Sequence, residues 1–240
     1  MPFFIFMPLK RNCLEESVAF EFEYHVMWET VPLLLNGMGL TLYITIIGLL
    51  AGFMVGVAMG LFKVSKYSCL RALSSVYVEI IRGTPLIVQV MFLYFGVPMA
   101  MGTRISPITA GIIAIAVNSG AYIAEIVRGA VQSIDVGQTE AGRSIGLTRM
   151  QTMIYVIWPQ AFRRMIPPLG NQFIISLKDT SLLVVIGVGE LTRQGQEIIS
   201  TTFRAFEIWL TVALLYLLMT FTLARLLRML EKKLMKKGVV

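Results

Sequence analysis

The chain has 240 residues, of which 56% are hydrophobic and only 15% are charged. Soluble domains carry about a quarter charged residues, so this composition predicts an integral membrane protein instead. The net charge of +7 does not indicate nucleic-acid binding, because the basic residues lie at the ends of apolar runs, as membrane topology requires. One histidine and two cysteines give no cluster for a metal site.

Residues 1–26 do not form a membrane span. The apolar stretch at residues 1–9 is too short, and Lys10 and Arg11 follow it, which is the reverse of the order in a signal peptide. We expect an extension on the outer surface, followed by one transmembrane domain over residues 27–240. An alternative is that Met27 is the natural start.

Five apolar stretches are each long enough to cross the bilayer as a helix, which takes about 20 residues. They cover about residues 32–62, 73–101, 107–127, 168–188 and 205–227. The predicted fold is therefore all-α, with five transmembrane helices. In the first stretch glycine recurs every four residues, which predicts a smooth stripe where another helix packs closely. These glycines are Gly48, Gly52, Gly56 and Gly60.

The basic residues predict the orientation of the chain. Most of them follow the first, third and fifth stretches, and the more basic side of a membrane protein is cytoplasmic. The N-terminus is therefore expected outside and the C-terminus inside. This topology places Cys13 and Cys69 on opposite sides, which argues against a disulfide between them.

Within the second stretch, Gly83 and Pro85 predict a kink or a break in the helix. Glu79 and Arg82 are three residues apart and close enough to pair, so the kink is either structural or part of a pathway. Gln89, one turn further, is expected to line a pathway. We expect the break to act as a gate formed by Arg82, Gly83, Thr84 and Pro85.

Polar residues in the third stretch also need partners. Asn118, at its middle, either makes hydrogen bonds between helices or lines a cavity. Glu125 and Arg128, again three residues apart, are expected to pair near the cytoplasmic end.

The fourth stretch contains Lys178, Asp179, Thr180 and Ser181. Neighbouring residues on a helix point about 100° apart, so Lys178 and Asp179 cannot simply neutralise each other. One interpretation is that they bind both ends of a zwitterionic solute. The alternative is that one of them pairs with a charge on another helix, such as Glu79 or Arg82.

The longest polar interruption, residues 138–147, follows the third stretch on the basic side. It predicts a short amphipathic helix that ends at Gly146. Thr148 and Gln151 have the spacing of a capping box, so a second helix should begin at once in a new direction. This bent pair is either a docking surface for a partner or an ordinary loop between two spans.

The bent pair resembles the "EAA loop" of the membrane subunits of ABC importers. The matching residues are Glu140, Ala141, Gly142, Gly146, Val156, Trp158 and Pro159. Gly142 and Trp158 depart from the pattern, which usually has alanine and leucine there. Further segments resemble the polar amino acid permease branch of this family, in order over about residues 27–235: residues 78–86, 118–125, 167–172, 176–182 and 190–197.

The resemblance implies a permease subunit in a bacterial inner membrane that translocates a polar amino acid, with glutamine as the first expectation. It implies a second membrane subunit, identical or homologous, and a periplasmic binding protein. Two cytoplasmic ATPase subunits would bind ATP and Mg²⁺ and dock on Thr139, Glu140, Ala141, Arg143, Ser144, Gly146 and Leu147. The solute region would map onto Gln89, Asn118, Lys178 and Asp179. The hydroxyls of Thr180 and Ser181, next to Asp179, are expected to contact the solute as well.

Two other functions are weaker. The sequence has no G-x-x-x-x-G-K-[ST] phosphate loop, so energy must come from a partner or an ion gradient. An ion-coupled secondary transporter is the alternative, although such transporters usually contain an inverted repeat and none is visible here. An intramembrane enzyme would need a catalytic triad, a metal cluster or an acid pair, and the sequence has none at usable spacing.

Overall fold

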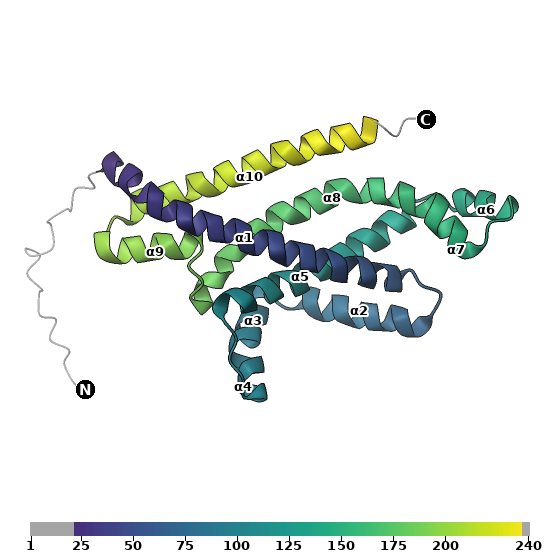
Figure 1. Cartoon of the computed structure of the whole chain (residues 1–240), viewed down its shortest axis with the longest axis horizontal. Helices are drawn as coiled ribbons and strands as arrows, with labels where there is room; N and C mark the ends of the chain where they lie inside the picture. Colours follow the sequence, from purple (N-terminus) through teal and green to yellow (C-terminus); the bar gives the residue numbers. More distant parts are fainter. Residues whose placement is uncertain (1–21, 237–240) are drawn as a thin grey trace, which may run out of the picture.

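The computed structural model describes residues 22–236, and these residues form helices and connecting turns without any strand (Figure 1). The first 21 residues, including Cys13 and most of the expected outer extension, lie outside the described part. Helix α1 begins at Tyr24, so the last residues assigned to that extension belong to α1.

Within the described residues, four helical segments are long and apolar enough to cross a membrane. They are α1 (Tyr24–Lys63), α5 (Pro107–Gln132), a composite run over Arg149–Ile186, and α10 (Ala205–Lys236). A fifth span arises if α2 (Ser68–Gly83) and the helical stretch Leu86–Met101 count as one. These two helices together are long and apolar enough, but they meet at a bend of 103°. The predicted break between Gly83 and Pro85 is therefore confirmed, and the all-α membrane fold with it.

The fourth span starts earlier than predicted. Helix α8 (Trp158–Asp179) contains Pro167 and Pro168 in its interior, whereas the predicted span begins at about residue 168. Upstream of it, α7 (Arg149–Thr152) and a π turn, η2 (Met153–Ile157), extend the run to the turn that follows α6 (Val136–Ser144). The expectation was wrong because proline is a usual but not an obligatory helix boundary.

In residues 22–236, two π turns each end two residues before a proline. Segment η1 (Phe92–Gly96) joins α3 (Leu86–Met91) to α4 (Val97–Met101), in which Pro98 is the second residue. Segment η2 likewise precedes Pro159, the second residue of α8. A proline ring clashes with the carbonyl four residues earlier, and a widened turn moves that carbonyl away. The π turns therefore let the helices continue past these prolines.

The glycine stripe of α1 packs against α5, as predicted. A Cβ atom added at Gly52 would lie 2.1 Å from Ser119 Oγ, and one at Gly56 would lie 2.6 Å from Ile123 Cβ. The same holds at Gly60, where the distance to Val127 Cβ would be 2.5 Å. Any larger residue would force the two helices apart.

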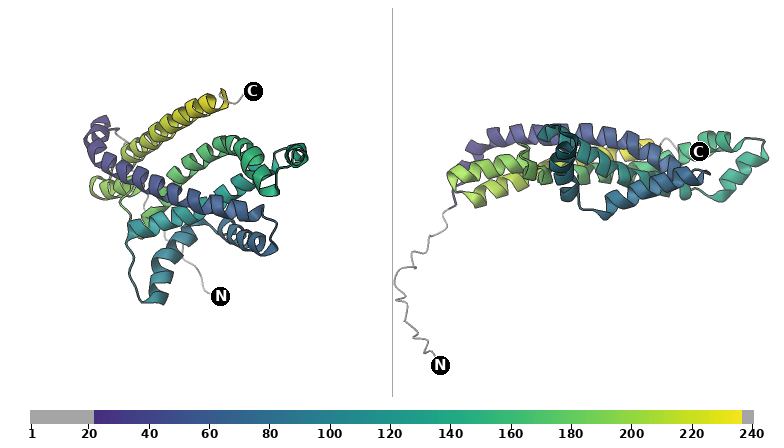
Figure 2. Two further views of the ribbon diagram at one scale, coloured as in Figure 1. Left: turned by 45° about the vertical axis from the view of Figure 1, so that its right-hand side comes forward. Right: turned by 90° about the horizontal axis from the view of Figure 1, so that it is seen from below.

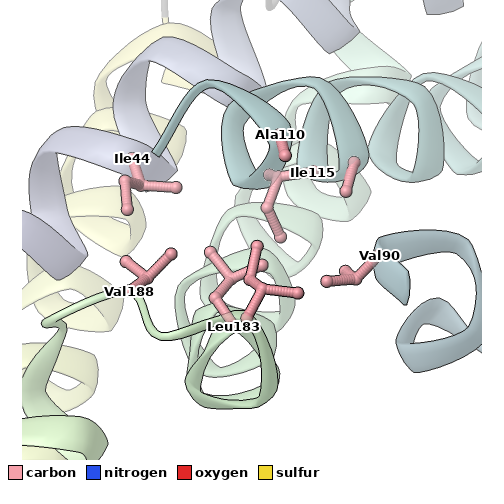
Figure 3. Close-up of a cluster of buried hydrophobic side chains, with 8 residues drawn as sticks. Ile44, Val90, Ala110, Ile115, Leu183 and Val188 are labelled. Carbon is pink, nitrogen blue, oxygen red and sulfur yellow. The ribbon is translucent and has the colours of Figure 1, made fainter. Parts of the chain in front are cut away.

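A buried apolar cluster fastens the break in the second span to this helix pair (Figure 3). It joins side chains from α1, α3, α5 and the 3-10 segment η3 (Thr180–Ile186). Its labelled members are Ile44, Val90, Ala110, Ile115, Leu183 and Val188. The cluster thereby fixes α3 and η3, which follows α8 directly, close to one another at the first turns of α5.

The two ends of the elongated molecule carry different short helices (Figures 1 and 2). At one end, α6 (Val136–Ser144) and α7 project beyond the long helices. At the opposite end, α9 (Leu191–Thr202) lies beside the first turns of α1 and α10. The backbone N–H of Leu191 donates to Thr41 Oγ1 at 3.2 Å, which ties α9 to α1.

Candidate functional site: a charged cavity at the helix break

A cavity of about 530 Å³ lies between the helix break, α5 and α8. Its walls combine a cation, an anion, two amides and apolar groups. The lining residues are Arg82, Gly83, Thr84, Pro85, Leu86, Asn118, Tyr122, Gln172, Ile175 and Asp179. All four residues of the predicted gate are among them.

Gln89 holds the break in shape from behind the cavity wall. Its amide nitrogen donates to the carbonyl oxygens of Ile81 at 2.7 Å and Thr84 at 3.0 Å, which lie at the end of α2 where no helical N–H follows. Its amide oxygen accepts a hydrogen bond from Asn118 Nδ2 at 3.2 Å. Gln89 itself is not among the lining residues, whereas Asn118 both bonds another helix and faces the cavity.

Arg82 turns toward α5. Its guanidinium lies 5.2 Å from the ring centroid of Tyr122, and its Nη1 lies 3.8 Å from Glu125 Oε2. The expected pair between Arg82 and Glu79 is therefore wrong: among the ion pairs of residues 22–236, Arg82 pairs with Glu125. The physical reason is that α5 offers a carboxylate and an aromatic face together, and both attract a guanidinium.

Glu125 pairs with Arg128, as predicted, and with further cations. Arg128 donates from Nε at 3.0 Å and from Nη2 at 2.7 Å to Oε2. Lys63, at the end of α1, donates to Oε1. One carboxylate therefore joins the ends of α1 and α2 to α5.

Lys178 and Asp179 diverge, as the helical geometry requires. Asp179 is half-buried and lines the cavity, while Lys178 is exposed and does not. The Thr180 hydroxyl donates to the Leu177 carbonyl at 2.7 Å, and the Ser181 hydroxyl donates to the Lys178 carbonyl at 2.7 Å. Both hydroxyls thus bond their own helix, where α8 changes into η3.

Four further residues line the cavity although they were not predicted to contact the solute: Leu86, Tyr122, Gln172 and Ile175. Gln172 is buried, and its amide nitrogen donates to Ser176 Oγ at 3.3 Å. A usable signal did exist on α8. Gln172, Ile175 and Asp179 are spaced by three and four residues, and that spacing places side chains on one face of a helix.

The polar segment over residues 138–151 has the predicted bent geometry, and we call it the docking loop after the role expected for it. Helix α6 ends at Ser144, and Gly146 then adopts a left-handed φ of 89°. Thr148 and Gln151 form the predicted capping box, with Thr148 N–H donating to Gln151 Oε1 at 2.8 Å. The loop exposes Glu140, Ala141, Arg143, Ser144 and Gly146 and half-buries Thr139 and Leu147.

Gly142 is the buried residue of α6. An added Cβ would lie 2.8 Å from Thr152 Cγ2, so glycine at this position lets α6 pack closely against α7. This contact gives a structural reason for the departure from alanine in the EAA pattern.

Residues 48–236 match the family described as "Binding-protein-dependent transport system inner membrane component". The chain belongs to this family. Its members are inner-membrane components, and the long apolar helices described above agree with a protein that crosses this membrane several times.

Two relatives and one solved structure that resemble this chain are described as transport proteins. The chain is 52% identical over 214 residues to the glutamine transport system permease protein GlnP of Escherichia coli (strain K12), covering 89% of this chain and 98% of that protein. It is 37% identical to the probable glutamine ABC transporter permease protein GlnM of Bacillus subtilis (strain 168), covering 88% and 97%. Among solved structures, one described as an amino acid ABC transporter with histidines matches with a TM-score of 0.85 and 41% identity, covering 89% of this chain and all of that one.

Proposed function

We propose that this chain is the permease subunit of an ABC importer that moves a polar amino acid, glutamine first, from the periplasm to the cytoplasm. The observation that carries the proposal is the cavity at the helix break, where Arg82, Asp179 and the amides of Asn118 and Gln172 surround one space. A zwitterion with an amide side chain offers a complement to each of these groups. The names of the two relatives support glutamine as the solute.

The partners follow from the family and the docking loop. Two cytoplasmic ATPase subunits bind ATP and Mg²⁺ and dock on the exposed residues of α6 and its turn. A periplasmic binding protein delivers the amino acid at the end that carries α9. A second membrane subunit, identical or homologous, completes the pathway. This chain itself is non-catalytic, and its α1 starts outside while α10 ends in the cytoplasm, as the distribution of basic residues supports.

The roles of the proposed site residues follow from their contacts. Asn118 and Asp179 contact the solute from α5 and α8. Gln89, Thr180 and Ser181 support these walls through their hydrogen bonds to backbone or to Asn118. Lys178, which is exposed outside the cavity, acts on the solute at most through its charge.

The test is uptake of labelled glutamine by proteoliposomes that contain the chain with its ATPase and its binding protein. Uptake should require internal ATP, and Asp179→Asn should reduce it at least tenfold because the ammonium group loses its anion. Glu79→Gln is a matched control, since it removes an exposed carboxylate on α2 that does not line the cavity.

Two results would contradict the proposal. One is uptake that proceeds at the same rate without ATP. The other is uptake that a proton ionophore abolishes while internal ATP stays high, which would favour the ion-coupled transporter.

A further inference from the structure

Arg82 is a cation that lines the cavity and makes only a long ion pair with its carboxylate partner. Its side chain is 44% exposed, and its nearest carboxylate oxygen, on Glu125, is 3.8 Å away. That distance is beyond a hydrogen bond. Asp179 lines the same cavity, but no ion pair joins it to Arg82 in the part of the chain that the structure describes. The cavity therefore holds a positive and a negative group that do not neutralise each other directly.

Glu125 does not depend on Arg82. Its two carboxylate oxygens already accept hydrogen bonds from Lys63 and from two nitrogens of Arg128. If Arg82 turned away, Glu125 would keep two cations in direct contact. Arg82 is thus the surplus cation of the cluster, and a new carboxylate in the cavity can take it at low cost.

We propose that Arg82 exchanges Glu125 for the α-carboxylate of the transported amino acid, a role that rests on the function proposed above. A guanidinium binds a carboxylate through two parallel hydrogen bonds, which is a closer contact than the one it now makes. The ammonium group of the solute then faces Asp179, and the amides of Asn118 and Gln172 remain for the side chain. Arg82 is therefore a specificity-determining residue for amino acids that carry a free carboxylate.

The exchange also links solute binding to the fold. Glu125 connects Lys63 at the end of α1 and Arg82 on α2 to α5. When the solute takes Arg82, this electrostatic tie between α2 and α5 is removed. Occupancy of the cavity then favours conformations in which α2 moves relative to the α1–α5 pair.

The experiment measures equilibrium binding of glutamine and of glutaminamide, in which a neutral amide replaces the α-carboxylate. It uses the complete permease–ATPase complex in nanodiscs. Wild type should bind glutamine at least tenfold more tightly than glutaminamide, in line with the strength of a charge-assisted pair. In Arg82→Gln this ratio should fall close to one, and Arg82→Lys should restore part of it.

Two further variants separate this role from a merely structural one. Glu125→Gln removes the competitor for Arg82 and should tighten glutamine binding severalfold, opposite in sign to Arg82→Gln. Arg128→Gln removes another cation from Glu125 that does not line the cavity, so it should keep the tenfold discrimination.

The outcomes are distinguishable. If Arg82→Gln keeps the discrimination, or if Arg82→Gln and Glu125→Gln weaken glutamine binding equally, the exchange is overturned while the proposed function stands. If wild type binds no polar amino acid at all, the proposed function fails and the exchange with it.

Discussion

A single methyl group is too large at Gly52. An added Cβ would lie 2.1 Å from Ser119 Oγ and 2.8 Å from the Ala116 carbonyl oxygen, which belongs to backbone and cannot simply move aside. We expect Gly52→Ala to destabilise the protein by about 1–3 kcal/mol, as overpacking of a tight contact does. Thermal unfolding of the purified protein in detergent would measure this.

Gly39 provides the matched control, because it lies in the same helix and an added Cβ there meets nothing within 4 Å. Gly39→Ala should leave the melting temperature unchanged or raise it, since alanine favours a helix by about 1 kcal/mol over glycine. Equal losses in both variants would contradict the close packing of α1 on α5.

For single residues, the sequence predicted those features that depend on the spacing of residues along one helix. The glycine stripe, the divergence of Lys178 from Asp179 and the pairing of Glu125 with Arg128 all follow from helical geometry. The partner of Arg82 did not follow, because it depends on how α2 crosses α5. A nearer residue in the sequence, Glu79, was the only candidate that local spacing offered.

Among the elements, α9 depends on one buried side chain. Glu190, which is fully buried, accepts the N–H groups of Thr192 at 3.0 Å and Arg193 at 2.8 Å, and the hydroxyl of Tyr216 at 2.9 Å. It therefore caps α9 and attaches the helix to α10. Glu190→Ala leaves all three donors without this acceptor, and we expect a loss of at least about 2 kcal/mol.

Hydrogen exchange of the α9 amides would measure the loss of stability within α9. Thermal unfolding of the whole protein would measure its effect on global stability. Glu197→Ala is the control, since this glutamate of the same helix is exposed and makes one surface ion pair. Unchanged protection of α9 in Glu190→Ala would show that packing on α1 holds the helix without its cap.

Element boundaries were predicted unevenly. The break at Gly83 and Pro85 was found because glycine and proline stand together there, and the capping box fixed the start of α7. The predicted start of the fourth span, at about Pro168, is wrong, because the helical run begins well upstream of this proline. A proline follows each π turn, but a proline alone does not predict one, because Pro167 and Pro168 lie inside α8 without a π turn before them.

At the scale of the whole molecule, we expect binding of the ATPase subunits to depend on the bent shape of the docking loop. Gly146 has a φ of 89°, a conformation that residues with a side chain rarely adopt. Gly146→Asp adds strain and a charge at the turn, so we expect the ATPase to be lost on purification and ATP-driven uptake to fall at least tenfold. Co-purification followed by uptake in proteoliposomes measures both.

The control for this variant is Gly129→Ala, an exposed helical glycine on α5 where an added Cβ meets nothing within 4 Å. It should assemble and transport like wild type. If Gly146→Asp also retains its ATPase and its uptake, then the partner does not dock on this turn.

The composite run from Arg149 to Ile186 starts at the docking loop and contains Asp179. One continuous but curved helical run therefore connects the surface proposed for the ATPase with Asp179 in the cavity, while Arg82 belongs to another helix, α2. Any tilt that nucleotide binding imposes on this helical run should change the distance between Arg82 and Asp179. An amino acid bound at both its carboxylate and its ammonium group would then lose one of these two contacts before the other. Its release would therefore need no further conformational change within the membrane.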